Sequence, residues 1–122
     1  MNAKTTDANS ERLSQAIATA NYRITLNNQK QNARLKLKKD LTYAINGGIF
    51  FITTELISFT SMLVLQGKTE AILLDNNNNP IEITDLVSFN DTILDKYYEL
   101  MNEFFVEFKQ INKSRTPALV GE

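Results

Sequence analysis

The side chains in this chain that could support chemistry are carboxylates, because the sequence contains no histidine and no cysteine. Disulfides and zinc–sulfur sites are therefore excluded, and the commonest general base is absent. One group of carboxylates recurs about every four residues near the end of the chain: Asp91, Asp95, Glu99, Glu103 and Glu107. Catalysis or metal binding would require such groups to converge inward. This spacing instead places them in a row along a helix, which favours a solvated or partner-binding face.

A second group of oxygen-bearing side chains is the run Asp75-Asn76-Asn77-Asn78-Asn79. It matches the first, third and fifth positions of an EF-hand calcium loop. The sixth position, which requires glycine, is Pro80, and the twelfth, which should be glutamate, is Leu86. The run is better explained as the tip of a β-hairpin. We therefore predict no metal, no cofactor and no enzymatic activity.

The charge of the chain is bipolar although its net charge is only −1. Residues 70–108 are strongly acidic, whereas residues 21–45 are basic. The basic cluster consists of Lys30, Arg34, Lys36, Lys38 and Lys39. Such a cluster could contact phosphates, so a nucleic-acid-associated accessory factor using residues 30–39 is the alternative function. Stacking aromatics are not interleaved with it, which favours a solvated face or a partner for the acidic helix of a neighbouring subunit.

The acidic row belongs to a predicted long helix that extends from Thr84 to about Asn112. Its apolar residues form two adjacent rows. The first row is Leu86, Phe89, Ile93, Tyr97, Met101, Phe104, Phe108 and Ile111, and the second is Leu94, Tyr98 and Phe105. A small core cannot cover both rows, and exposed aromatic surface is typical of interfaces. The predicted interface residues are Tyr97, Tyr98, Met101, Phe104, Phe105 and Phe108.

The region before this helix predicts shorter elements. We expect a strand at Ile49–Ile52 and a helix at about 54–66, capped by Thr53 or Thr54, nearly all buried and ended by Gly67. Glu70–Leu74 and Ile81–Ile83 should form a hairpin. The three strands could then form one small sheet.

The first third of the chain allows three interpretations. The preferred one is a long polar helix from about 9 to 44 that ends at Asn46-Gly47-Gly48 as a left-handed cap. Alternation of apolar residues also allows a hairpin within residues 21–45. In the third, Asn46-Gly47 is a tight turn between strands at Leu41–Ile45 and Ile49–Ile52.

The predicted fold class is therefore α+β: a long N-terminal helix, a small three-stranded antiparallel sheet with a central helix, and a long C-terminal helix. Residues 1–45 would be a helical arm, residues 46–112 a compact core and residues 113–122 an extended tail. The apolar stretch Ile49–Leu65 contains Glu55 and is short for a membrane span. We expect a soluble intracellular protein that does not contact a membrane.

Four stretches give the chain an overall resemblance to a small type of protein in contractile-tailed phages. They are NYRITLNNQKQNARLKLK, NGGIFFITTELISF, AILLDNNNNPIEITDL and YYELMNEFFVEFKQINKSR. The resemblance implies a non-enzymatic virion or assembly component, located in the virion or in the host cytoplasm during assembly. The expected function is thus a structural or assembly subunit that acts through protein–protein contacts, as a homo-oligomer or as part of a larger assembly.

Overall fold

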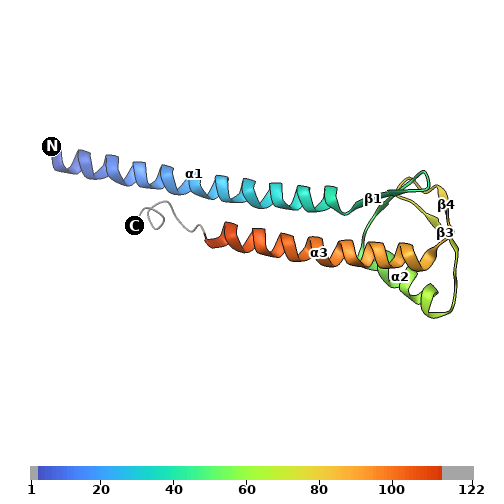
Figure 1. The fold of residues 1–122 in the computed structure, drawn as a ribbon. Coiled ribbons are helices and arrows are strands. Elements are labelled where there is room, and N and C mark those ends of the chain that lie inside the picture. Colours follow the sequence, from blue (N-terminus) through green and yellow to red (C-terminus); the bar gives the residue numbers. More distant parts are fainter. Residues whose placement is uncertain (1–2, 114–122) are drawn as a thin grey trace. The chain divides into compact units, whose positions relative to one another are not determined.

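The computed structural model describes the backbone of residues 3–113 and the side chains of residues 8–113. The elements, in chain order, are α1 (Ala3–Asp40), β1 (Thr42–Ile45), β2 (Gly48–Phe51), α2 (Thr54–Leu65), β3 (Ala71–Leu74), β4 (Pro80–Ile83) and α3 (Leu86–Lys113) (Figure 1). The α+β class is confirmed. The chain divides into two compact units. Unit 1 comprises Met1–Ala33 and Val106–Glu122, and unit 2 comprises Arg34–Phe105. The division into an arm, a core and a tail stays a prediction.

The first helix is longer at its start and shorter at its end than the sequence predicts, since α1 begins at Ala3 and ends at Asp40. A hairpin within residues 21–40 is therefore wrong. Asn46 and Gly47 do not cap this helix, because they form the two-residue turn between β1 and β2, with φ of 52° and 81°. Two consecutive positive φ angles match the twist of a hairpin. The third interpretation, a tight turn at Asn46-Gly47, is confirmed.

The predicted three-stranded sheet is wrong, because the strands form two separate antiparallel pairs, β1–β2 and β3–β4. The loop between β3 and β4 bonds to the free edge of β2. The Asn76 N–H donates to the Ile49 carbonyl at 2.8 Å, and the Asn76 side-chain oxygen accepts from the Phe51 N–H at 2.9 Å. Exposed edges of strands are usually paired or covered. Here a loop satisfies the β2 edge, so no third strand pairs with it.

The core of unit 2 lies where the two hairpins meet the beginning of α3 (Figure 1). Its buried residues are Phe50, Ile52, Leu73, Ile81, Ile83, Leu86, Phe89 and Ile93. The Phe89 ring packs edge-on against Phe50, with centroids 5.4 Å apart, and lies 6.0 Å from the ring of Tyr43. Alternate residues of β2 and β4 point into this core, as the period of two in a strand requires.

Helix α2 begins and ends as predicted. The Thr53 side chain accepts from the Leu56 N–H at 3.1 Å, and Gly67 follows the helix with a φ of 84°. The prediction that α2 is nearly all buried is wrong, since Thr60 is its one buried residue. Phe59, Met62 and Leu65 lie on its uncovered side and are 46%, 49% and 88% exposed. The buried side of α2 faces α3, because the Thr60 hydroxyl bonds to the Asn90 side chain.

Helix α3 runs from Leu86 to Lys113 without interruption, as predicted from about Thr84 onward. Asp85 caps it, because its carboxylate accepts from the Ser88 N–H at 3.1 Å. Lys113, the first residue of the predicted tail, is still helical. The remainder of that tail, residues 114–122, lies outside the described residues.

Unit 1 consists, in its described part, of helix alone. The first stretch of α1 contacts the last stretch of α3, where the Lys30 ammonium lies 5.2 Å from the centre of the Phe108 ring. Ala33, three residues after Lys30 on α1, is buried, with 2% of its surface exposed. The Tyr22 hydroxyl is buried without a hydrogen-bond partner among the described residues. This unit has little enclosed apolar volume.

Candidate interaction surfaces

The Asn-rich loop uses its carboxylate to build the fold. One oxygen of Asp75 accepts from the N–H groups of Asn77 and Asn79 at 3.0 and 2.9 Å. Its other oxygen accepts from the Ile49 N–H at 3.1 Å. These backbone hydrogen bonds, led by that from Asn79, hold the pKa of the buried Asp75 carboxyl below its ordinary value. Both carboxylate oxygens of Asp75 thus accept hydrogen bonds from backbone N–H groups, and the bond from Ile49 links the β3–β4 hairpin to β2.

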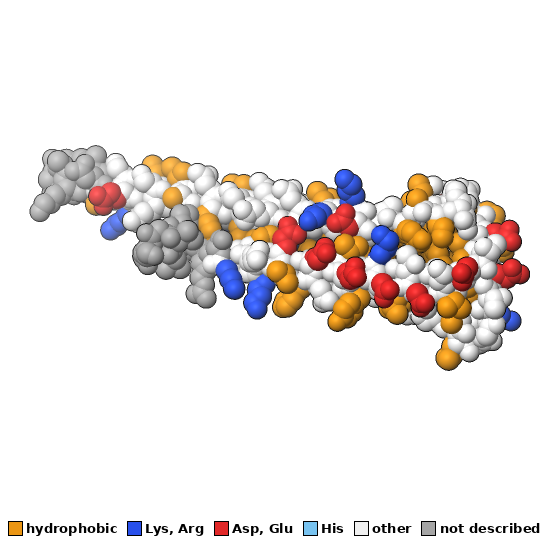
Figure 2. All heavy atoms as spheres, in the orientation of Figure 1, with side chains coloured by type: hydrophobic (Ala, Val, Ile, Leu, Met, Phe, Trp, Pro, Cys, Tyr) orange, Lys and Arg blue, Asp and Glu red, His pale blue; other side chains and the backbone are white. Residues whose placement is uncertain are grey.

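The acidic row of α3 does not converge on a point. Asp91, Asp95, Glu99 and Glu103 are exposed and Glu107 is half-buried, and Figure 2 shows acidic side chains following the helix with hydrophobic ones beside them. In the part of the chain that the structure describes, no three acidic, histidine or cysteine side chains are placed to hold a metal ion. The row can therefore provide negative potential along the helix, for attraction of a basic surface.

The two apolar rows of α3 differ sharply in exposure. The first row is turned inward: Leu86, Phe89 and Ile93 are buried, and Tyr97 packs against the core. Residues farther along this row, from Met101 to Ile111, are half-buried. The second row is turned outward, and Leu94, Tyr98 and Phe105 are 44%, 69% and 65% exposed. Val87 extends the second row toward the start of the helix and is 45% exposed.

The six predicted interface residues are consequently split between the two rows. Tyr97, Met101, Phe104 and Phe108 belong to the inward row, and Phe108 contacts Lys30 of the same chain. Tyr98 and Phe105 belong to the outward row. The second set is accessible to another molecule, and the first set contributes mainly to packing within the chain.

The predicted phosphate-binding residues also fall into two sets. Lys30, Arg34 and Lys38 follow one side of α1, as the spacing of four residues predicts. Two of these cations lie against aromatic rings: Lys30 against Phe108, and Lys38 at 5.8 Å from the Phe51 ring centre. Lys36 and Lys39 lie on other sides of the helix and are exposed.

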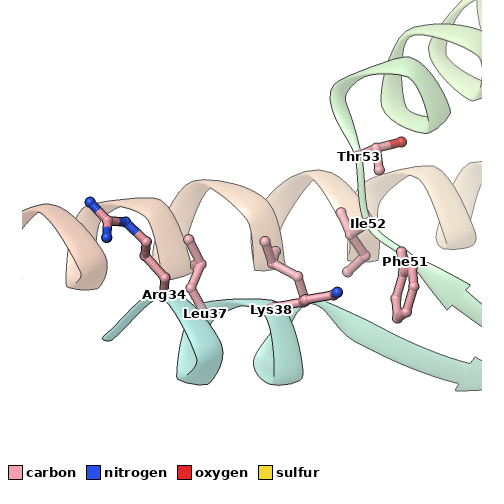
Figure 3. A pocket seen from close by; sticks show the side chains of 7 residues that line it. Arg34, Leu37, Lys38, Phe51, Ile52 and Thr53 are labelled. Carbon is pink, nitrogen blue, oxygen red and sulfur yellow. The ribbon is translucent and has the colours of Figure 1, made fainter. Parts of the chain in front are cut away.

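A groove of about 280 Å³ lies beside this basic stretch, within unit 2 (Figure 3). Its lining residues come from the end of α1 and from the segment after β2: Arg34, Leu37, Lys38, Leu41, Phe51, Ile52 and Thr53. No carboxylate lines it, so it contains no acid–base pair. Its walls are apolar, and Lys38 reaches across toward Phe51. The sequence did not predict this groove. One wall is the end of α1 and the other is the segment after β2, and the β1–β2 hairpin lies between them. The position of the second wall depends on the geometry of that hairpin, which local sequence patterns do not determine.

Further apolar side chains are exposed on both hairpins and on α1. On the hairpins, Ile49 and Phe51 of β2 and Ile72 and Leu74 of β3 face outward, at 42% to 64% exposed. On α1 the exposed apolar residues are Leu13, Ile17, Ile24 and Leu35. The sequence signal for this row was the helical spacing of Leu13, Ile17 and Ile24, which does not reveal whether a row faces inward or outward.

Two polar residues are buried between α2 and α3. The Thr60 hydroxyl donates to the Asn90 side-chain oxygen at 2.7 Å, and the Ser61 hydroxyl donates to the same oxygen at 3.0 Å. Asn90 is thereby satisfied inside the unit, as buried polar groups generally are. Both hydroxyls donate to an amide oxygen, which is not a base, so these contacts position α2 on α3.

None of the helices within residues 3–113 combines the length and the apolar character that crossing a membrane requires. Comparison of the chain with protein-family models, with curated proteins and with solved structures found no match. Among the surfaces described above, the outward row of α3 has the most exposed aromatic side chains, Tyr98 and Phe105.

Proposed function

We propose that this chain is a non-enzymatic structural or assembly subunit that acts through protein–protein contacts in an oligomer. The observation that carries the proposal is the outward row of α3, where Tyr98 and Phe105 are 69% and 65% exposed. Exposed apolar surface that continues along several turns of a helix is typical of interaction sites. Tyrosine and phenylalanine are enriched in interfaces because each buries a large area.

The resemblance to contractile-tailed phage proteins supports a more specific form of the proposal. In this form the assembly is a phage virion, and the chain occurs in the virion or in the host cytoplasm during assembly. The absence of histidine and cysteine from the sequence supports the non-enzymatic role.

The test is the oligomeric state of the purified chain, measured by light scattering over a range of concentrations. We expect a mass above the 13.9 kDa of one chain. The double variant Tyr98→Ser, Phe105→Ser should lower that mass. A matched control is Ile72→Ser, Leu74→Ser, because these hairpin residues are both 64% exposed and lie outside α3. The control should keep the mass of the natural chain.

Two outcomes would contradict the proposal. A natural chain that stays monomeric at every concentration lacks the expected contact. An oligomer that both double variants retain does not use the outward row of α3.

The alternative, a nucleic-acid-associated factor, is separated from this proposal by a salt titration. Phosphate contacts make affinity fall steeply with salt. Binding to DNA at low ionic strength that Lys36→Glu, Lys39→Glu abolishes would favour the alternative, since both side chains are exposed. Absence of binding at low ionic strength would eliminate it.

A further inference from the structure

Helix α1 carries apolar residues on two opposite sides. One residue turns the helix by about 100°, so positions 13, 17, 24 and 35 fall within an arc of roughly 40°. This outer row consists of Leu13, Ile17, Ile24 and Leu35, which are 63%, 52%, 58% and 54% exposed. Residues 22, 26 and 33 lie about half a turn away and are buried or half-buried. Among the described residues, one side of α1 is covered and the other side is left exposed.

Helix α3 has an outer row of matching length. Val87, Leu94, Tyr98 and Phe105 fall within an arc of roughly 40° and extend over about 27 Å of helix. The outer row of α1 extends over about 33 Å. Two rows of this kind can pack side by side, as in helix pairs that bury apolar rows between them.

The charges beside the two rows are of opposite sign. Lys38 and Lys39 are exposed residues of α1 that flank its outer row. Asp91 and Asp95 are exposed and flank the outer row of α3. Packing α1 on α1 of a second copy would bring cations together, and packing α3 on α3 would bring carboxylates together. Like charges in an interface are costly, so complementary rows are favoured.

We propose that the outer row of α1 packs on the outer row of α3 of a second copy of this chain, with the two helices antiparallel. The inference rests on the proposed function and names the partner of its α3 surface. Residues whose numbers add up to 122 then face each other. Three apolar pairs result: Leu35 with Val87, Ile24 with Tyr98, and Ile17 with Phe105.

A parallel register also aligns three apolar pairs, and charge distinguishes it from the antiparallel one. In the parallel register Ile24 faces Phe105, and the basic residue Lys30 of α1 comes beside Lys109 and Lys113 of α3. In the antiparallel register the basic end of α1 lies beside the acidic beginning of α3. The antiparallel register is therefore the one that avoids repulsion.

Disulfide cross-linking provides the first test, because the natural chain has no cysteine. Full-length chains carrying Ile24→Cys are mixed with full-length chains carrying Tyr98→Cys and are oxidised. We expect a covalent dimer from the mixture on a non-reducing gel, and monomer from either variant alone. Packing of 24 on 98 brings the two sulfurs within bonding range, which a disulfide requires.

Every other cross-linking pattern overturns the inference. A dimer from Ile24→Cys alone would indicate α1 on α1, and a dimer from Tyr98→Cys alone would indicate α3 on α3. A dimer from Ile24→Cys mixed with Phe105→Cys, and not with Tyr98→Cys, would indicate the parallel register. An oligomer in which no pair links refutes this inference and leaves the proposed function intact, whereas a strictly monomeric chain refutes both.

A charge reversal is the second test and does not depend on oxidation. Asp91→Lys, Asp95→Lys should weaken self-association about fivefold, because it removes the negative charge that flanks the outer row of α3 and faces the basic end of α1. An unchanged or stronger self-association would contradict the antiparallel register. Circular dichroism of the variant, with unchanged helix content expected, excludes unfolding as the cause.

Discussion

Unit 2 and unit 1 differ in how many apolar side chains they bury. Unit 2 encloses eight apolar residues, seven from three strands and α3 and one, Ile52, directly after β2. In unit 1, Ala33 is the one buried apolar residue among the side chains described. The apolar residues of α1 are divided between two sides of the helix, so a single neighbouring helix cannot cover them all. This difference indicates that unit 2 holds most of the stability of the isolated chain.

The two units also differ in how well their buried polar groups are hydrogen-bonded. In unit 2 the Asp75 carboxylate, the Asn90 amide oxygen and the caps at Thr53 and Asp85 all accept hydrogen bonds. In unit 1 the Tyr22 hydroxyl is buried and has no hydrogen-bond partner within the part of the unit that the structure describes. Satisfied networks specify one arrangement of the chain, whereas an orphaned group costs free energy. Four substitutions test this comparison, in order of decreasing expected effect.

The largest effect is expected from Phe89→Ala in unit 2. Phe89 is 2% exposed and contacts the rings of Phe50 and Tyr43. Removal of a buried phenylalanine ring lowers the free energy of unfolding by about 3–5 kcal/mol. Leu26→Ala, at a half-buried position of unit 1, should cost less than about 1.5 kcal/mol because little volume is enclosed there. Urea unfolding followed by circular dichroism measures both, and equal losses would contradict the comparison.

Gly48→Ala should have the next largest effect. A Cβ at this position would lie 2.5 Å from Cγ1 of Ile81, which is itself part of the core. Overpacking of this kind costs about 1–3 kcal/mol. Gly47→Ala is the matched control, because a Cβ there meets open space and the cost comes from the positive φ alone, about 1 kcal/mol. A smaller loss for Gly48→Ala than for Gly47→Ala in thermal unfolding would argue against the close packing of the two hairpins.

Asp75→Asn should destabilise unit 2 in a pH-dependent manner. The pKa of Asp75 is lowered in the folded state from its ordinary value of 3.8, so its stabilisation is present above about pH 4 and is lost as the pH falls further. The amide of asparagine would also present a donor toward the Ile49 N–H. The gap in unfolding free energy between natural chain and variant should therefore shrink below pH 4.

The control for this prediction is Asp85→Asn, at an exposed cap with one hydrogen bond. It should show a smaller loss at neutral pH. If Asp75→Asn has the same stability as the natural chain at pH 7, Asp75 does not tie the hairpins together.

The smallest effect is expected from Tyr22→Phe in unit 1. Removing a buried hydroxyl that has no partner should leave the stability unchanged or raise it by up to about 1 kcal/mol. Tyr98→Phe, at an exposed position, should change nothing in the monomer. A clear loss of stability in Tyr22→Phe would show that the hydroxyl is bonded in solution, and the contrast between the two units would weaken.

Local signals predicted several elements well. Thr53 before α2, Gly67 after it and the Asn-rich tip between β3 and β4 act through backbone geometry and hydrogen bonds a few residues apart. The long helix α3 followed from its apolar period. The end of α1 was missed because Lys38-Lys39-Asp40 carries no strong stop signal and Asn46-Gly47 suits a cap and a hairpin turn equally.

The apolar surface of α3 was predictable only in part, because local spacing shows which residues share a row and does not show which row is buried. The two rows of α3 could be read from spacing, but the choice of which row faces inward required the hairpins to be placed. Tyr97 and Phe108 were therefore grouped with Tyr98 and Phe105, although the structure turns the two pairs to different sides. The groove beside Lys38 needed the same placement.

The sequence by itself determined the α+β class, the helical period of α1 and α3, the bipolar charge and the absence of histidine and cysteine chemistry. These properties depend on residue type and on spacing within one element. The tertiary structure alone decided that the strands form two pairs, that Asp75 bonds across 26 residues to Ile49, and which apolar row of each helix stays exposed. Such features depend on contacts between residues distant in the chain, whose energies are similar for several arrangements until the whole core is packed.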